Sequence, residues 1–315
     1  MRTRLLFAAA SAAFALTPAS DAAITFFDIF YTASYTQSTQ SPPTTPDLYY
    51  FATRVISDTP SDLSGAKLSV PPASVLYTLF PVAPGSFLAV RNYAGEAAMD
   101  AAFPAGTYNF SISGGTLGNA SDSIQRVGPL FFSSEIPAFD GATMDRFAAF
   151  PADQDVSVDF GGFSPPAGTN VGTIFLTVFD SNNAVVFNTF DNASAMSFTI
   201  PAGTLQPAAS YRATLYYSAR IETANAGFGS ATSIIGCDRA TSATIATRAA
   251  CAGDLNADSL VDDADFVIFA AAYNILDCAD PGMPAGCPAD LNADTFVDDA
   301  DFVLFASAYN ELVCP

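Results

Sequence analysis

The chain ends in two copies of one segment, and this duplication limits the possible folds more than any other feature of the sequence. Residues 254–278 read DLNADSLVDDADFVIFAAAYNILDC and residues 290–314 read DLNADTFVDDADFVLFASAYNELVC, with 19 of 25 positions identical. Both copies begin with oxygen-bearing side chains at positions 1, 3, 5, 9 and 12. This is the spacing at which a twelve-residue loop wraps a calcium ion. The repeat therefore predicts two similar calcium loops.

Each loop offers a full set of calcium ligands, because calcium takes six to eight hard oxygen atoms. Position 7 would bind through its backbone carbonyl, and position 9 directly or through water. The predicted ligands are Asp254, Asn256, Asp258, Leu260, Asp262 and Asp265 in the first loop, and Asp290, Asn292, Asp294, Phe296, Asp298 and Asp301 in the second. Position 6, where glycine usually supplies a left-handed backbone, holds Ser259 and Thr295. We therefore expect the second site to be weaker, since threonine is β-branched.

A helix is predicted after each loop. Four apolar residues recur at helical spacing in each copy: Phe266, Phe269, Ala270 and Tyr273, then Phe302, Phe305, Ala306 and Tyr309. Asp262 and Asp298 are expected to cap these helices. Val261 and Val297, at position 8, are expected to pair across the two loops. No amphipathic helix is predicted before Asp262.

The first 22 residues have the layout of a secretory signal peptide. Two arginines precede an apolar run from Leu5 to Leu16, and Ser20 and Ala22 suit the −3 and −1 positions of a cleavage site. The apolar run is shorter than the roughly 20 residues that a membrane span needs, and no later segment is long enough. The mature chain is therefore predicted to begin at residue 23, to have no membrane span, and to be secreted, extracellular or at the cell surface.

Acidic residues are concentrated in the repeats. The net charge is −20, and the segment from residue 251 onward holds 13 acidic residues and no Lys or Arg. Calcium ligation requires such a concentration of acid, whereas nucleic-acid binding requires a basic surface. DNA and RNA are therefore excluded as partners.

Four of the five cysteines follow the repeat. Cys251 and Cys287 each precede a loop by three residues, and Cys278 and Cys314 each close a copy. In an exported protein this placement indicates disulfides, and four cysteines allow three connectivities. Cys251–Cys314 with Cys278–Cys287 is favoured if the copies pack as a pseudo-twofold pair. The fifth, Cys237, is expected to be a buried thiol, the alternative being an intermolecular link.

A tandem pair of loop-then-helix half EF-hands at the C-terminus of an exported chain resembles a type I dockerin module. The resemblance covers residues 251–315 and implies docking, in either of two orientations, onto a cohesin-like or cell-envelope protein. The family's contact positions, 10, 11, 17, 18 and 22 of each copy, fall on Asp263, Ala264, Ala270, Ala271 and Ile275, and on Asp299, Ala300, Ala306, Ser307 and Glu311.

The residues between the signal peptide and the repeats have a dominant period of two, which is typical of half-buried strands. Alternation is clear at Val156–Phe160, Met196–Ile200, Tyr108–Ile112 and Val75–Leu79, and residues 180–183 are expected to form a hairpin turn. The predicted fold class is mainly β. Two immunoglobulin-like β-sandwich domains, residues 23–135 and 136–248, precede a small α-helical dockerin-like calcium-binding module at residues 249–315. Residues 205–215, LQPAASYRATL, resemble the tyrosine corner of a fibronectin type III domain, which assigns that fold to residues 136–248.

The chain contains no histidine, which excludes Ser-His-Asp and Cys-His catalysis and His-ligated zinc. Whether the chain is an enzyme stays undecided. A glycoside hydrolase needs only two carboxylates, and the candidates are Asp28, Glu96, Asp100, Asp145, Asp155, Asp159 and Glu222. We expect a non-catalytic secreted β-sandwich protein that the module attaches to a surface or scaffold partner. The alternative is a carbohydrate-active or carbohydrate-binding protein that acts in polysaccharide breakdown.

Overall fold

The computed structural model describes residues 24–59, 62–72, 75–115, 117–224, 228, 231–248, 253–256, 258, 260–284, 286–292 and 294–311. The predicted signal peptide, residues 1–22, lies outside them. Within these residues the chain is mainly β, as predicted, and no helix among them is long and apolar enough to cross a membrane.

The strands are β1 (Ile24–Thr36), β2 (Leu48–Ser57), β3 (Gly65–Val70), β4 (Val75–Ala83), β5 (Ser86–Tyr93), β6 (Gly106–Ser113), β7 (Ala120–Arg126), β8 (Val156–Asp159), β9 (Val171–Phe179), β10 (Val185–Asn192), β11 (Ser197–Ile200), β12 (Ser210–Ala224) and β13 (Thr232–Ala246). The helices are α1 (Glu96–Ala102), α2 (Gly141–Ala148), α3 (Asp263–Tyr273) and α4 (Asp299–Glu311). The sequence predicts no amphipathic helix before Asp262, but α1 and α2 form there. With seven and eight residues, both are too short to show a repeated apolar stripe.

One sheet holds eleven of the strands in the order β10-β9-β12-β13-β1-β2-β5-β4-β3-β6-β7, and β8 pairs with β11 in a second, two-stranded sheet. At the centre of the large sheet β1 runs parallel to β13, from the Phe26–Thr232 pair to the Thr36–Ser242 pair. Strands from both predicted sandwich domains therefore share one sheet. The boundaries at residues 135 and 248 stay predictions.

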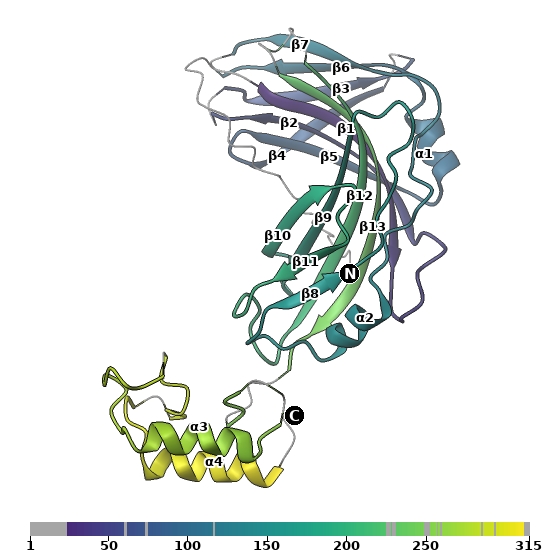
Figure 1. Ribbon diagram of the computed structural model, residues 1–315. Coiled ribbons are helices and arrows are strands. Elements are labelled where there is room, and N and C mark those ends of the chain that lie inside the picture. Colours follow the sequence, from purple (N-terminus) through teal and green to yellow (C-terminus); the bar gives the residue numbers. More distant parts are fainter. Residues whose placement is uncertain are drawn as a thin grey trace, which may run out of the picture. The chain divides into compact units, whose positions relative to one another are not determined.

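The large sheet folds over so that β6 faces β1 across a common core (Figure 1). The ring of Phe27 on β1 packs edge-on against Phe110 on β6, with centroids 5.0 Å apart. The hydroxyls of Tyr31 and Tyr108, on the same two strands, lie 2.9 Å apart. Alternate residues of β1 and β6 point into this core, as the period of two requires.

Two local predictions in the β region are confirmed. The backbone N–H of Gln206 donates to the Tyr211 hydroxyl at 2.8 Å, which is the hydrogen bond of a tyrosine corner. The hairpin between β9 and β10 turns at residues 180–183, where the Asp180 carboxylate accepts from the N–H groups of Asn182 and Ala184, both at 2.8 Å. Asn183 takes the left-handed conformation, with φ of 62°.

Contacts between residues group the chain into two compact units. Among the described residues, the first contains residues 24–145, 158–198 and 212–244, and the second contains residues 146–157, 199–211 and 245–311. In the second unit, the N–H of Phe150 donates to Ala246 and that of Ala208 donates to Arg248. The duplicated segment also belongs to this unit.

An acidic side chain, Asp28, is fully buried in the first unit. Its carboxylate accepts from the backbone N–H and the Nε of Arg54, each at 2.8 Å, and lies 2.7 Å from Nη2 of the same arginine. The Arg54 guanidinium also covers the rings of Phe26 and Phe30, at 5.3 and 5.6 Å from their centroids. A buried charge needs such a paired and hydrogen-bonded partner.

The negative charge of a second acid, Asp238 on β13, is only partly compensated by neighbouring groups. Burial raises its pKa from 3.8 to about 6, against the opposing effects of a Ser218 hydrogen bond and the Arg220 charge. Its Oδ1 atom is buried with no hydrogen-bond partner among the described residues. The charged form of Asp238 therefore opposes folding at neutral pH.

Asp238→Asn is expected to raise the free energy of unfolding at pH 8 by about 1–2 kcal/mol. Because the folded-state pKa lies above the unfolded value, the contribution of Asp238 to stability is fully present below pH 3.8 and is lost as pH rises through about 6. Urea unfolding of wild type and variant from pH 4 to pH 8 measures this. Parallel stability profiles of the two proteins across that range would show that Asp238 does not titrate in this way.

Candidate metal centre

The first loop is organised around Asp265, the residue at its twelfth position. This side chain is fully buried, and its Oδ1 accepts from the N–H groups of Leu255 at 2.7 Å and Asn256 at 3.0 Å. Its Oδ2 accepts from the N–H of Asp262 at 3.0 Å, while the Asp262 carboxylate accepts from Ala264 at 2.8 Å. Asp262 therefore caps α3 in a capping box, as predicted.

The second loop repeats this arrangement. Oδ1 of the buried Asp301 accepts from Leu291 at 2.7 Å and from Asn292 at 3.0 Å, and Oδ2 accepts from Asp298 at 2.9 Å. The Asp298 carboxylate accepts from the N–H of Ala300 at 2.8 Å, which is the predicted cap of α4. Two copies that differ at six of 25 positions thus hold the twelfth residue of their loops by the same three hydrogen bonds.

The structure brings the carboxylates of positions 1, 5 and 12 together in each loop. One oxygen from each of Asp254, Asp258 and Asp265 lies within 4.8 Å of the others, and the same holds for Asp290, Asp294 and Asp301. At position 3, each asparagine amide donates to the carboxylate of position 5 at 2.9 Å. The carboxylates of position 9 lie outside these groups and serve as helix caps, consistent with binding through water.

This donor set fits calcium. All the grouped atoms are oxygens, and calcium takes carboxylate, amide and carbonyl oxygens in flexible geometry. Three carboxylates within 4.8 Å repel one another, at about 1 kcal/mol per pair in water and about 4 kcal/mol near a protein surface. Residues 251–315 contain no Lys or Arg that could offset this repulsion. Each loop is therefore suited to a divalent cation that removes the repulsion.

Position 6 of the second loop has the backbone that the calcium loop requires. Thr295 has φ of 77°, in the left-handed region, and its N–H donates to Oδ2 of Asp290 at 2.9 Å. Glycine adopts this conformation without strain, whereas a β-branched residue does not. The equivalent residue of the first loop, Ser259, lies outside the described residues.

Helices α3 and α4 lie side by side and are joined at both ends by the same hydrogen bond (Figure 1). The Tyr273 hydroxyl of the first copy donates to Asp299 of the second at 2.5 Å, and Tyr309 of the second donates to Asp263 of the first at 2.6 Å. The hydrogen bond and charge of the neighbouring carboxylate raise the pKa of both tyrosines. The two helices are therefore antiparallel and related by pseudo-twofold symmetry.

These Tyr–Asp pairs were not expected from the sequence. The signal lay in the repeat, since both copies have aspartate at position 10 and tyrosine at position 20. Asp263 and Asp299 are also among the residues at which the resemblance predicts partner contact, and here each accepts a hydrogen bond within the C-terminal segment.

Two sequence expectations for the module need correction. The N–H of Val297 donates to the carbonyl of Leu276 at 2.8 Å and not to Val261, because the segment after α3 folds back onto the second loop. The valine side chains do share one core. The buried stripe of α3 runs through Asp265, Phe269 and Ala272, whereas Phe266 is 45% exposed. The helix is rotated relative to the predicted stripe because the buried carboxylate occupies part of the core face.

Among the cysteines, Cys278 and Cys287 form a disulfide and Cys237 is a buried free thiol, in agreement with the sequence expectations. Burial raises the pKa of the Cys237 thiol. The other expected pair, Cys251 and Cys314, lies outside the described residues.

Five of the seven candidate carboxylates of a glycoside hydrolase have separate local partners in the described structure. Asp28 pairs with Arg54, Asp100 with Arg126, and Glu222 with Arg220. Asp145 accepts from Gln40, and Asp155 accepts from the N–H of Ala202. Glu96 lies in the first turn of α1, and Asp159 ends β8.

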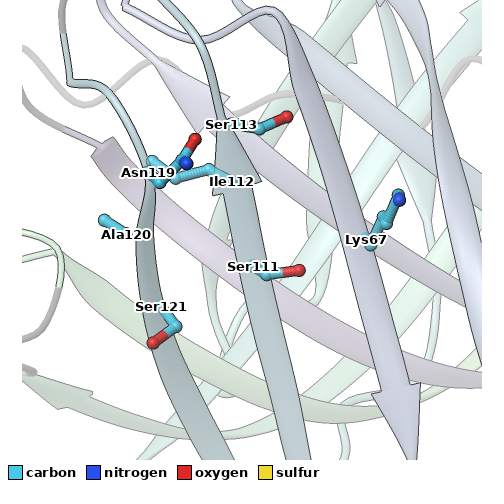
Figure 2. Close-up of a pocket in the computed structure, with 7 residues that line it drawn as sticks. All are labelled: Lys67, Ser111, Ile112, Ser113, Asn119, Ala120 and Ser121. Carbon is cyan, nitrogen blue, oxygen red and sulfur yellow. The ribbon is translucent and has the colours of Figure 1, made fainter.

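An open cavity of about 380 Å³ lies beside β3, β6 and β7 (Figure 2). Its described lining contains neither an acidic nor an aromatic side chain: Lys67, Ser111, Ile112, Ser113, Asn119, Ala120 and Ser121. The lining therefore supplies neither the acid pair of a glycosidase nor an aromatic surface for stacking on a sugar.

No protein-family model matches the chain, and no curated protein matches it. Among solved structures, the chain is similar to the BSP domain of a biofilm-associated protein, at 17% identity and a TM-score of 0.19, over 73% of this chain and 29% of that one. It thus spans less than a third of that protein. A segment of two fibronectin type III domains from chicken tenascin matches at 13% identity and a TM-score of 0.22, over 62% of this chain and 92% of that one. The fibronectin domains FN1–FN3 of chicken CNTN1 match at 10% identity and a TM-score of 0.20, over 65% and 62%.

Proposed function

We propose that this chain is an exported, non-catalytic β-sandwich protein whose residues 249–315 form a dockerin-like module that binds two calcium ions and docks onto a partner protein. The observation that carries the proposal is the pair of loops in which buried Asp265 and Asp301 organise equivalent groups of carboxylates. Calcium would neutralise these groups and order both loops at the ends of α3 and α4. The module would attach the β-sandwich region to a surface or scaffold.

The docking surface of this proposal is the outer side of the two helices. On α3, Ala264, Val267 and Ala271 follow at helical spacing and are all exposed. The equivalent residues of α4 are Ala300, Val303 and Ser307, also exposed. We call these two sets the outer stripes. Small residues at four of the six positions allow another backbone to approach closely.

Charge complementarity indicates the chemistry of the partner. The outer stripes are largely apolar, and the whole module is acidic with no Lys or Arg. A partner protein that presents an apolar surface with a basic rim would complement both properties. Calcium lowers the negative charge of the loops. It leaves unchanged the negative charge of the helices and of the linker, the segment between the two copies (residues 279–289).

Val267→Glu with Val303→Glu is expected to weaken calcium-dependent docking by about thirtyfold or more, because both valines sit at the centre of the outer stripes. Each is 67% exposed, so the substitutions should leave the fold intact. The test is a pulldown from the source organism's envelope and culture fluid with the mature chain as bait, in calcium and in chelator. Ala279→Glu, on the exposed linker, adds a single charge away from both stripes and serves as the control.

Retention of one protein by the wild type and the control in calcium, but by neither in chelator, would support docking. If the variant retained the same protein as well as the wild type, the outer stripes would not be the docking surface. Specific retention of the mature chain on polysaccharide, with no protein bound, would favour the carbohydrate alternative.

A further inference from the structure

The segment that joins the two copies folds back onto the second calcium loop. After α3 ends, Leu276 accepts from the N–H of Val297 at 2.8 Å, and the N–H of Cys278 donates to the carbonyl of Thr295 at 3.1 Å. Asp277 and Phe296 thereby form an antiparallel bridge. Positions 6 to 8 of the second loop are thus held by residues of the first copy.

One of the residues held in this way, Thr295, has a strained backbone. Thr295 has φ of 77°, and a left-handed conformation costs a non-glycine residue stability unless its surroundings enforce it. Its two backbone groups are both engaged, the N–H with Asp290 of its own loop and the carbonyl with Cys278. The hydrogen bond from Cys278 therefore fixes the peptide group that follows Thr295.

The disulfide connects this point to the start of the same loop. Cys287 is bonded to Cys278, and its carbonyl accepts from the N–H of Asp290, the first ligand position, at 3.1 Å. The Sγ of Cys278 also lies 3.7 Å from Oδ2 of Asp290. One covalent link thus joins the residue that holds position 6 to the residue that holds position 1.

We propose that the Cys278–Cys287 disulfide is a positioning element of the second calcium site. It holds Thr295 in the conformation that glycine would adopt unaided, and so keeps Asp290 in place to bind calcium. This inference rests on the proposed calcium function and adds that the second loop depends on the disulfide. The sequence expectation of a weaker second site then applies mainly to a chain that lacks this link.

The test measures calcium binding at the second loop alone in the mature chain. Asp254→Ala removes the first site, and Cys278→Ser with Cys287→Ser removes the disulfide in the same background. Calorimetric titration with calcium should show about tenfold weaker binding. The reason is that Thr295 would no longer be held in its left-handed conformation. Cys237→Ser, a cysteine outside the module, is the matched control and should leave the calcium affinity unchanged.

Thr295→Gly separates the proposed effect on Thr295 from a general loss of stability that the cysteine substitutions could cause in the module. Glycine adopts the left-handed backbone without strain, so removing the disulfide from the Thr295→Gly chain should cost less than about threefold in affinity. An equal tenfold loss with threonine and with glycine would overturn the inference, as would no loss with threonine. Absence of calcium binding in the Asp254→Ala parent would instead show that the proposed calcium site itself is wrong.

Discussion

Replacing Asp265 and Asp301 together by asparagine is expected to abolish calcium binding and unfold the C-terminal module at neutral pH. Each carboxylate is fully buried, accepts three backbone hydrogen bonds, and supplies the twelfth position of its loop. An ion present at 100 times its Kd stabilises a folded site by about 2.7 kcal/mol, so two sites contribute about 5 kcal/mol. That is as much as the core of so small a module supplies.

The measurement is circular dichroism of the mature chain in calcium and in chelator. The wild type should gain helical signal with calcium, and the double variant should not. Asp280→Asn, which removes one negative charge from the exposed segment between the copies, should behave as the wild type. Calcium-induced helicity that survived in the Asp265→Asn, Asp301→Asn chain would contradict the proposed ligand roles.

Asp28→Ala is expected to lower the free energy of unfolding of the β-sandwich region by about 3–5 kcal/mol. The substitution leaves the Arg54 guanidinium, whose side chain is 14% exposed, without the carboxylate that accepts from its Nε and lies 2.7 Å from Nη2. A buried charge without a partner costs more than the pair itself contributes. Denaturant unfolding followed by tyrosine fluorescence measures the change.

A paired replacement separates this effect from a general loss of packing. Asp28→Leu with Arg54→Met removes both charges and should recover most of the lost stability, because apolar residues of similar volume often replace a buried ion pair without cost. If Asp28→Ala lowered the free energy of unfolding by less than about 1 kcal/mol, the claim that Arg54 needs Asp28 as its ion-pair partner would be contradicted.

The grouping of carboxylates in each loop, the helix caps and the tyrosine corner could be predicted because each depends on residues close in sequence. The carboxylates of a loop lie within twelve residues, and the Gln206–Tyr211 hydrogen bond spans five. In these cases, spacing along the chain determines which atoms meet. The disulfide between Cys278 and Cys287 was favoured on a different ground, the expected pseudo-twofold packing of the copies, since four cysteines allow three connectivities.

The pairing of β1 with β13 could not be predicted, because it joins residues about 200 apart and parallel pairing leaves no hairpin signal. The alternation of apolar residues along the sequence places Phe27 and Tyr31 in a core, but it does not show which strand packs against them. Likewise, the apolar spacing of α3 did not show that a carboxylate, Asp265, would occupy its core face. Long-range pairing and a buried charge both depend on the assembled structure.

The most direct test of the calcium proposal is calorimetric titration of the calcium-free mature chain with calcium. We expect two ions bound per chain, together with a gain of helical signal as the loops become ordered. A chain that remains folded in chelator and binds no calcium would contradict the account, since the two groups of carboxylates would then have no cation to hold.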